Sequence, residues 1–338
     1  MFKTIRTQDA VGSILCQDVT KITPGFKGAA FTKGHVVAES DVEELLNIGK
    51  YHLYVWDAPA DFVHENDAAV RLADILDGGG LERGEVKEGK LSLYARCDGL
   101  LKVDAGELFK LNMIDELMAA ALHTDIPVKS GQLVGGTRVI PLAVPAQTLS
   151  RAETEVKRGV IRVLPFKSAR IGIVITGTEV YEGRIRDAFG GVLLKKAAEY
   201  GCEAAGTVIL PDDRERIASA IEGYVAAGCG IVFCAGGMSV DADDLTPAAI
   251  KQVCGELITY GSPILPGAMF LLAYKGPAAI MGLPGCVMHS RRTALDLILP
   301  RALAGERLTK SDIARYGHGG QCQNCGECVF PACAFGKF

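Results

Sequence analysis

The stretch IGIVITGTE (171–179) decides the fold of this chain of 338 residues. It joins an apolar run, typical of a buried strand, to a glycine turn, and an amphipathic helical pattern follows over 190–201. The same order recurs twice, where IVF leads into CAGGMSVDADD (234–244) and AAI leads into MGLPGC (281–286). Strand, loop and helix in repetition predict right-handed βαβ units around a parallel sheet. We therefore expect a three-layer, parallel-sheet α/β domain over residues 166–308.

The three loops that follow these strands are predicted to hold a phosphate-bearing ligand. Ligand crevices of open parallel sheets lie at the carboxyl ends of the strands. Glycine lets backbone N–H groups approach a phosphate closely, and a helix N-terminus adds a favourable dipole. Carboxylates beside a phosphate need a bridging cation, and Mg²⁺ is usually held by one or two carboxylates plus substrate oxygens. Glu179, Asp187 and Asp244 are placed for this task.

Ordinary structural explanations compete with a ligand site at these loops. Any single glycine can form a plain tight turn, and Ser239 can stabilise its own turn. Asp241 and Asp243 can be solvated loop charges. Thr246, followed by Pro247, suits the N-cap of a helix. The joint occurrence of the three loops in this order is what favours the ligand.

Residues 168–305 resemble the molybdopterin-binding domain shared by molybdopterin molybdenumtransferases and molybdopterin adenylyltransferases. The transferases' first loop reads T-G-D-E-L and is followed by G-x-I-x-D-S-N. Here TGTEV and GRIRDAF keep Gly177, Glu179 and Asp187.

The second and third loops carry the rest of the resemblance. The family's GGVSVGDYD becomes GGMSVDADD, which keeps Gly236, Gly237, Ser239 and Asp244. Its GLPGNP becomes GLPGCV.

The chain also departs from the transferase pattern at three positions. Thr178 stands where T-G-D-E-L has its aspartate, Ala268 replaces the lysine of PGKP, and Cys286 replaces the asparagine of LPGNP. The lost lysine is a cation suited to molybdate or phosphate. The segment DDLTPAAI (243–250) is closer to the adenylyltransferase pattern D-V-T-P-E-A. The resemblance therefore implies the ligand more firmly than the reaction.

By this resemblance, the protein acts in molybdenum cofactor biosynthesis. The transferases take adenylylated molybdopterin, cleave the adenylyl group and insert molybdate into the dithiolene. Carried over, Glu179, Asp187 and Asp244 are catalytic, and Glu179 and Asp244 also hold Mg²⁺. The cofactor is bound by loop residues, namely Gly177, Thr178, Gly236, Gly237, Ser239, Pro284 and Gly285.

Two alternatives to molybdate insertion stay open. One is molybdopterin adenylyltransferase activity. The other is a non-catalytic chaperone or sensor that delivers molybdopterin to a partner molybdoenzyme. Related cofactor-synthesis proteins commonly self-associate, so the resemblance also implies a homo-oligomer.

The N-terminal half divides into two expected modules without a motif of known chemistry. Residues 1–58 read as a small α+β module, whose helix over 39–49 has Ser40 as its expected N-cap and Glu43 as the partner in a capping box. Residues 59–165 read as a β-rich module with helices.

The segment 309–338 is a cysteine-rich tail. Cys322, Cys325, Cys328 and Cys333 follow the spacing C-x2-C-x2-C-x4-C. The compact start of this run favours an iron–sulfur cluster, although ferredoxins have three residues before the fourth cysteine, so Zn²⁺ stays an alternative. Unmetallated thiols are the least favoured interpretation, because cytosolic disulfides are uncommon.

Composition limits the functional classes further. A net charge of −4 with 49% hydrophobic residues gives no reason to expect nucleic-acid binding. The most apolar stretch, 262–288, is interrupted by prolines and lysine, so a membrane span is not expected. The N-terminal MFKTIRTQDA lacks the apolar core of a signal peptide. A cytoplasmic location follows as the default expectation.

Overall fold

A computed structural model describes residues 3–24, 26–56 and 61–338. The chain divides into two compact units. The first comprises residues 1–96, 103–122 and 131–162, and the second comprises 97–102, 123–130 and 163–338. The four expected modules stay a prediction, because this division does not test their boundaries. None of the helices in the described residues is long and apolar enough to cross a bilayer.

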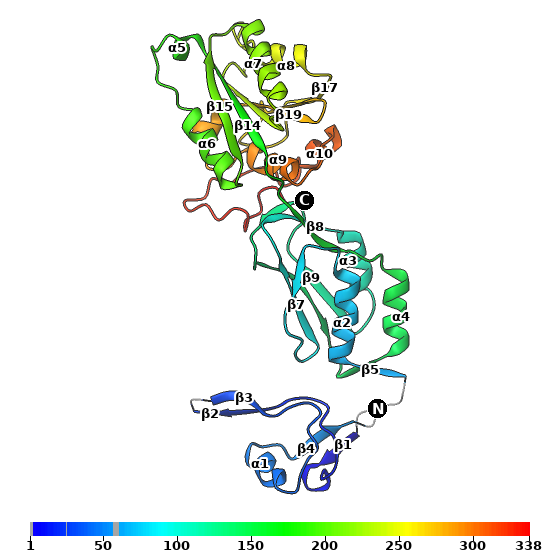
Figure 1. The fold of residues 1–338 in the computed structure, drawn as a ribbon. Coiled ribbons are helices and arrows are strands. Elements are labelled where there is room, and N and C mark those ends of the chain that lie inside the picture. Colours follow the sequence, from blue (N-terminus) through cyan, green and yellow to red (C-terminus); the bar gives the residue numbers. More distant parts are fainter. Residues whose placement is uncertain (1–2, 25, 57–60) are drawn as a thin grey trace. The chain divides into compact units, whose positions relative to one another are not determined.

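A six-stranded sheet forms the centre of the second unit, with the strand order β15-β14-β16-β19-β18-β17 (Figure 1). The first four strands of this order run parallel, and β17 and β18 are antiparallel at one edge. The strands are β14 (Arg170–Thr176), β15 (Glu203–Leu210), β16 (Ile231–Ala235), β17 (Glu256–Tyr260), β18 (Leu271–Lys275) and β19 (Ala278–Leu283).

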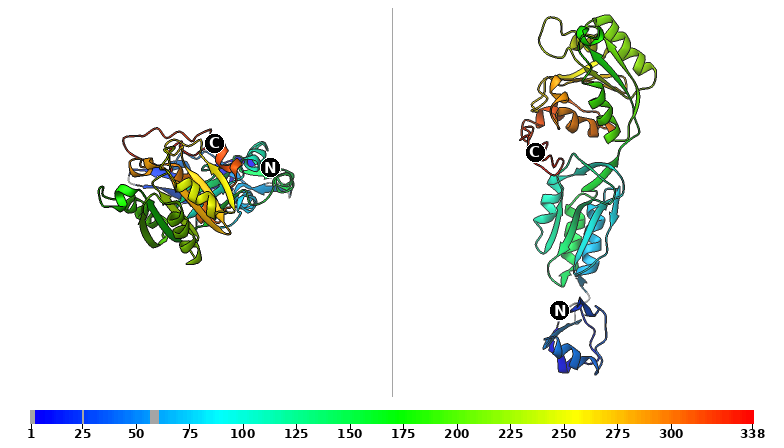
Figure 2. Two further views of the ribbon diagram at one scale, coloured as in Figure 1. Left: turned by 90° about the horizontal axis from the view of Figure 1, so that it is seen from above. Right: turned by 90° about the vertical axis from the view of Figure 1, so that its left-hand side faces the viewer.

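Helices cover both faces of this sheet (Figures 1 and 2). Helices α6 and α9 pack in the core of one face, and α7 and α8 pack in the core of the other. The helices are α5 (Thr178–Tyr181), α6 (Gly190–Glu199), α7 (Arg214–Ala226), α8 (Thr246–Val253), η2 (Gly285–Met288), α9 (Ala294–Leu303) and α10 (Lys310–Arg315). The expected three-layer α/β architecture is confirmed.

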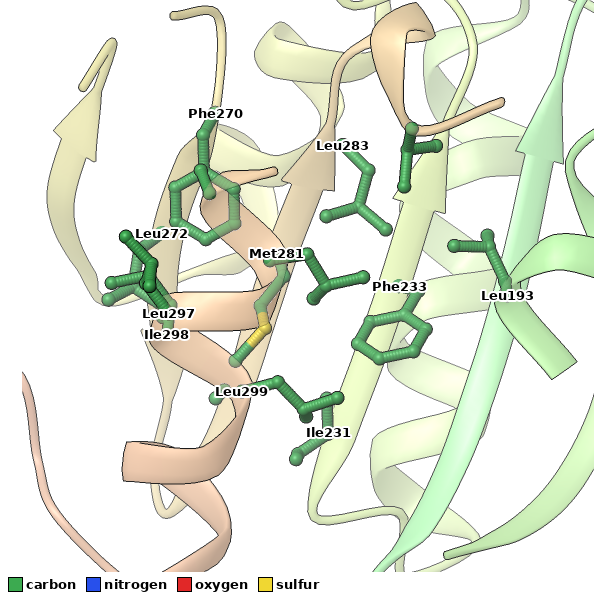
Figure 3. Close-up of a cluster of buried hydrophobic side chains, with 14 of the residues drawn as sticks. Leu193, Ile231, Phe233, Phe270, Leu272, Met281, Leu283, Leu297, Ile298 and Leu299 are labelled. Carbon is green, nitrogen blue, oxygen red and sulfur yellow. The ribbon is translucent and has the colours of Figure 1, made fainter. Parts of the chain in front are cut away.

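Alternation along the strands builds the two cores. In β16, Phe233 faces the core of α6 and α9, whereas the neighbouring Cys234 faces the core of α7 and α8. Successive side chains of a strand point to opposite faces, so continuous apolar strands need cover on both sides. Figure 3 shows Leu193 of α6 and Leu299 of α9 packed around Phe233 and Met281.

The first unit begins with a small α+β fold that has its own buried cluster, including Leu15, Leu45 and Leu53. Its elements are β1 (Lys3–Arg6), η1 (Thr7–Asp9), β2 (Val19–Thr23), β3 (Phe26–Phe31), α1 (Asp41–Asn47) and β4 (His52–Val55). The expected capping box is absent. Ser40 makes no capping hydrogen bond, and Asp41 Oδ2 accepts the Ala38 N–H at 2.8 Å. The aspartate next to Ser40 satisfies a backbone group of this turn.

The rest of the first unit is rich in β-strands with three helices. Its elements are β5 (Phe62–His64), α2 (Glu65–Leu76), β6 (Leu81–Arg83), β7 (Lys90–Ala95), α3 (Ala105–Asn112), β9 (Leu117–Ala121), β11 (Leu133–Val139), β12 (Ala143–Pro145) and α4 (Ala146–Glu155). A three-stranded sheet with the order β10-β8-β13 lies mostly in the second unit and is built from β8 (Gly99–Val103), β10 (Ile126–Val128) and β13 (Ile161–Pro165).

Candidate functional site

Parallel pairing places the three glycine loops next to one another. Ile175 of β14 pairs with Ala235 of β16, and Ala235 pairs with Leu283 of β19. Each pair lies within one residue of its strand's carboxyl end, so the loops that begin at 177, 236 and 284 leave the same sheet edge. The expected ligand crevice therefore has a structural basis at this edge.

The first loop is tied to a carboxylate that the sequence analysis did not single out. Asp212 Oδ2 accepts two hydrogen bonds from Thr178, at 2.8 Å from the backbone N–H and 3.0 Å from the hydroxyl. The Asp212 N–H donates to Thr178 Oγ1 at 3.1 Å. Thr176 pairs with Leu210, which brings the segment after β15 to this edge. Glu179 is exposed on α5 beside this pair.

The second loop approaches the first strand so closely that glycine is required. A Cβ added at Gly236 would lie 2.0 Å from the carbonyl oxygen of Thr176, and Gly236 has a φ of +93°. Side chains rarely adopt this backbone conformation. Gly237 also has a positive φ, of +53°, and its Cβ would lie 3.4 Å from Asp212 Oδ1. The loop backbone is thus packed against both Thr176 and Asp212.

Thr246 connects the second loop to the first strand instead of capping its helix. The structure begins α8 at Thr246 itself, with Leu245 at the N-cap position and no side-chain cap. The Thr246 and Thr176 hydroxyls are hydrogen-bonded at 2.9 Å, and both side chains are buried. The predicted N-cap was therefore wrong, because a buried hydroxyl partner was available across the sheet edge.

Tyr260 also holds the second loop. Its hydroxyl donates to the carbonyl oxygens of Met238, at 3.1 Å, and Ser239, at 3.0 Å. Burial raises the pKa of Tyr260, and the negative charge of Asp244 raises it further. Asp244 closes a turn with Asp241, whose carbonyl accepts the Asp244 N–H at 3.1 Å. Ser239 is exposed and Asp244 half-buried at this loop.

Asp187 serves the start of α6 in this structure. Its Oδ1 accepts the Phe189 N–H at 2.8 Å, and its Oδ2 accepts the Gly190 N–H at 3.0 Å. A carboxylate at this place satisfies free N–H groups of the helix and complements its dipole. The catalytic role expected for Asp187 stays a prediction beside this capping role.

The third loop continues directly into η2. Pro284 precedes this short helix and Gly285 is its first residue. Burial raises the pKa of the Cys286 thiol, which favours the protonated form. Ala268 follows Gly267, where a Cβ would lie 2.6 Å from that of Ala294 at the start of α9.

Within residues 3–24, 26–56 and 61–338, no group of three or more His, Cys, Asp or Glu side chains is arranged to hold a metal ion. Glu179, Asp187 and Asp244 form no such group in the described part of the chain. The four tail cysteines do not form one either, and they line one cavity together.

Asp212 and Tyr260 are the site residues that sequence reasoning missed. Asp212 lies between β15 and α7, and Tyr260 lies on β17, a strand that the sequence pattern did not predict. The position of Asp212 directly after the strand TVIL was the one available signal, because parallel strands end at a common edge. Tyr260 had no comparable signal.

Two segments of the chain match known protein families. Residues 172–304 match the family described as "Probable molybdopterin binding domain". Residues 4–57 match a domain family of unknown function.

The curated relatives match over part of the C-terminal half. A CinA-like protein of Mycobacterium sp. (strain MCS) is 40% identical over 92 residues, which cover 27% of this chain and 22% of that protein. A CinA-like protein of Mycobacterium avium (strain 104) is 36% identical over 130 residues, which cover 38% of this chain and 30% of that protein. The chain thus spans less than a third of the length of these relatives.

The comparison with solved structures finds proteins of molybdopterin and tungsten cofactor synthesis. The molybdopterin biosynthesis enzyme MoaB of Thermus thermophilus has a TM-score of 0.37 and 19% identity, covering 41% of this chain and 98% of its own. The tungsten cofactor synthesizing protein MoaB of Pyrococcus furiosus has a TM-score of 0.32 and 18% identity, covering 36% and 84%. The family assignment rests on the sequence match over 172–304.

Proposed function

We propose that this protein binds molybdopterin at the carboxyl edge of its parallel sheet, because residues 172–304 match the molybdopterin-binding domain family. The observation that carries the proposal is the adjacency of the loops after β14, β16 and β19. Gly177, Gly236 and Gly285 supply close backbone approaches for the pterin phosphate. Thr178, Gly237, Ser239 and Pro284 complete the set of cofactor-binding residues.

The reaction we propose is a step of molybdenum cofactor biosynthesis in the cytoplasm. The substrate is adenylylated molybdopterin, and molybdate is inserted after loss of the adenylyl group. Glu179 and Asp244 are the proposed Mg²⁺ ligands, with substrate phosphates completing the shell. When bound, the ion supplies charge neutralisation at the phosphates. Asp187 keeps the backbone of the second half of the first loop in place through its bonds to Phe189 and Gly190.

Two features of the sequence support the two alternative functions within molybdenum cofactor biosynthesis. The segment DLTP (244–247) favours molybdopterin adenylyltransferase activity. Ala268, in place of a lysine, favours a non-catalytic carrier that delivers molybdopterin to a molybdoenzyme. A homo-oligomer is compatible with all three.

One set of incubations tests these functions. The full chain is given molybdopterin with Mg²⁺-ATP in one reaction, and adenylylated molybdopterin with Mg²⁺ and molybdate in another. Molybdenum cofactor as the product of the second reaction supports the main proposal. Adenylylated product in the first supports the adenylyltransferase. Stoichiometric pterin binding without conversion supports the carrier, and no binding of either pterin refutes the ligand assignment.

The substitution Asp244→Ala tests the site. We expect reduced turnover with an unchanged unfolding midpoint, because Asp244 lies in a loop and its hydrogen bonds close a turn with Asp241. The matched control is Asp243→Ala, which removes an exposed carboxylate one residue away. Equal turnover of the two variants and the unsubstituted chain would remove Asp244 from the site.

A further inference from the structure

The C-terminal segment 319–336 closes into a defined loop. The Gly336 N–H donates to the Gly319 carbonyl at 2.9 Å, which joins the two ends of the segment. A Cβ at Gly319 would lie 2.0 Å from the Lys337 carbonyl oxygen, so backbone passes directly against backbone there. This segment contains the four cysteines of the tail, and we call it the cysteine loop.

The cysteine loop is anchored on the molybdopterin-binding domain. The Cys322 N–H donates to the Leu265 carbonyl, and the Leu265 N–H donates to the Gly320 carbonyl, each at 2.8 Å. Phe335 is buried in the core of α6 and α9, and Phe330 and Phe338 pack against the same core. Burial of aromatic side chains stabilises this arrangement substantially. The loop is therefore held by the domain and does not need a metal to find its place.

A cavity of about 460 Å³ lies between the cysteine loop and the turn over residues 289–292. Its lining includes Cys322, Cys325, Cys328 and Cys333. Cys325 and Cys328 are exposed, whereas Cys322 and Cys333 are half-buried. Cavities of several hundred cubic ångströms hold polyatomic ligands. All four thiols are thus available to one bound group of substantial size.

The volume of the cavity and the spacing of the thiols in the sequence suit a cluster better than a single ion. Zn–S bonds measure about 2.3 Å, so four thiolates on one zinc ion lie within about 4.6 Å of each other. The described residues contain no metal-ion ligand group of this kind, although all four thiols line the cavity. An iron–sulfur cluster has several irons and separate cysteine attachment points. The C-x2-C-x2-C start of the run is the spacing of such ligands.

The opposite wall of the cavity carries positive charge. Arg291 supplies this charge, because the guanidinium of Arg292, which also lines the cavity, is paired with Asp296 and Glu199. Arg291 Nη1 donates to the Gly326 carbonyl at 2.8 Å, between Cys325 and Cys328, and the Arg292 guanidinium lies 4.9 Å from the Phe330 ring centre. Cationic groups stabilise thiolates and the net negative charge of a thiolate-ligated cluster.

We propose that this cavity holds a four-iron iron–sulfur cluster ligated by Cys322, Cys325, Cys328 and Cys333. Each thiol loses its proton to solvent as its sulfur bonds iron. Two ferrous, two ferric and four sulfide ions are the other components, so assembly needs no separate oxidant. Arg291 is a positioning residue, because it fixes the backbone between two ligands. His289 directly follows η2, so one short helix joins the cluster cavity to the third loop of the molybdopterin site. The inference does not depend on the proposed function.

Metal analysis of the full chain tests the proposal. The protein is purified anaerobically, incubated with equal amounts of ferrous and ferric iron and with sulfide, and freed of unbound ions. We expect about four irons and four acid-labile sulfides per chain, with visible absorption that bleaches on reduction. One zinc per chain without sulfide would overturn the proposal. A chain that retains no iron, although its circular dichroism spectrum shows that it is folded, would also overturn the proposal.

Cysteine variants assign the ligands. The double substitution Cys325→Ser and Cys328→Ser removes two exposed thiols, so the fold should persist while bound iron falls at least tenfold. The matched control is Cys202→Ser with Cys254→Ser, two half-buried thiols outside the cavity lining. Full iron and sulfide content in the Cys325 and Cys328 double variant would overturn the ligand assignment. Pterin binding is measured in parallel and is expected to survive loss of the cluster.

The role of Arg291 has its own readout. We expect Arg291→Ala to release iron to a chelator several-fold faster and to change the reduction potential of the cluster, because one positive charge and one backbone anchor are lost. Arg291→Lys should recover part of the potential, since it restores the charge. Identical potentials and release rates in all three proteins would remove Arg291 from the proposal.

Discussion

The substitution Gly236→Ala is the most direct test of how the loops are held together. The added Cβ would lie 2.0 Å from the Thr176 carbonyl oxygen and 2.8 Å from Thr176 Oγ1. Thr176 cannot retreat freely, because β14 is paired with β15 on one side and β16 on the other. The backbone at Gly236 must also keep a φ of +93°.

The expected loss of stability is the sum of the backbone strain and the close contact with Thr176. A left-handed backbone costs about 1–2 kcal/mol for a residue with a side chain. Overpacking in an interior that cannot relax costs about 1–3 kcal/mol. We therefore expect Gly236→Ala to lower the free energy of unfolding of the second unit by about 2–5 kcal/mol. With a urea dependence of about 1–3 kcal/mol per molar, the midpoint falls by about 0.7 M or more.

Two other glycines separate the cost of backbone strain from the cost of the close contact. Gly183 has a φ of +75° with no atom within 4 Å of its added Cβ, so Gly183→Ala reports backbone strain alone. Gly191 lies within α6, has no positive φ and has equally open space, so its substitution is expected to be neutral or slightly stabilising. Urea unfolding is followed by circular dichroism, with hydrogen exchange of β14 and β16 peptides assigning the transition. If Gly236→Ala costs no more than Gly183→Ala, the close contact with Thr176 is refuted.

Two further predictions concern charged groups of the second unit. The Asp296 side chain is fully buried and pairs with Lys196 and with Arg292 at 2.8 Å, so Asp296→Asn leaves cations without their partner and should cost about 3–5 kcal/mol. The control Glu199→Gln, at a partly exposed carboxylate, should cost less than about 1 kcal/mol in the same urea titration. At Asp312, burial raises the pKa, but hydrogen bonds from Thr309 and Arg301 outweigh it and lower the pKa to about 2. Because this folded value is below the unfolded one, the contribution of up to about 2 kcal/mol is complete above about pH 4 and is lost as the pH falls toward 2. Asp312→Asn should remove this part of the acid dependence of unfolding, and an unchanged slope between pH 4 and 2 would contradict it.

The sequence was sufficient to predict the layered domain because its signals are local. Continuous apolar runs such as IVFCA mark strands that need cover on both faces, and glycine turns mark where the strands end. The antiparallel edge strands β17 and β18 were not predicted. Pro263 and Pro266 separate the two strands, and their antiparallel pairing depends on tertiary contacts that periodicity does not encode.

The candidate site was predictable only in part, for a related reason. Loop position follows from strand order, so Gly177, Gly236 and Pro284 were brought to one edge as expected. Hydrogen-bond partners across that edge do not follow from local sequence. Thr246 satisfies its hydroxyl with Thr176, and Tyr260 reaches the second loop from another strand. Side-chain competition of this kind is decided by the tertiary structure.

The departure from the transferase motif at Thr178 has a structural explanation in Asp212. The motif T-G-D-E-L would place an aspartate where Thr178 donates its N–H and its hydroxyl to the Asp212 carboxylate. Thr178→Asp exchanges one hydroxyl donor for a second negative charge beside the first. The loss of two hydroxyl-mediated bonds costs about 1 kcal/mol each, and repulsion between charges about 4 Å apart adds about 1 kcal/mol or more.

A double-mutant cycle measures this dependence. We expect Thr178→Asp to destabilise the second unit by about 2–3 kcal/mol, and the added Asp212→Asn to recover about 1 kcal/mol by removing the repulsion. Thr178→Asn is the matched variant, because it has the shape of aspartate without its charge and can still donate to Asp212. The urea midpoints of the single and double variants give the coupling energy. Equal stability of Thr178→Asp and Thr178→Asn would show that neither the added charge nor the lost donor beside Asp212 explains the threonine, since these two properties distinguish the variants.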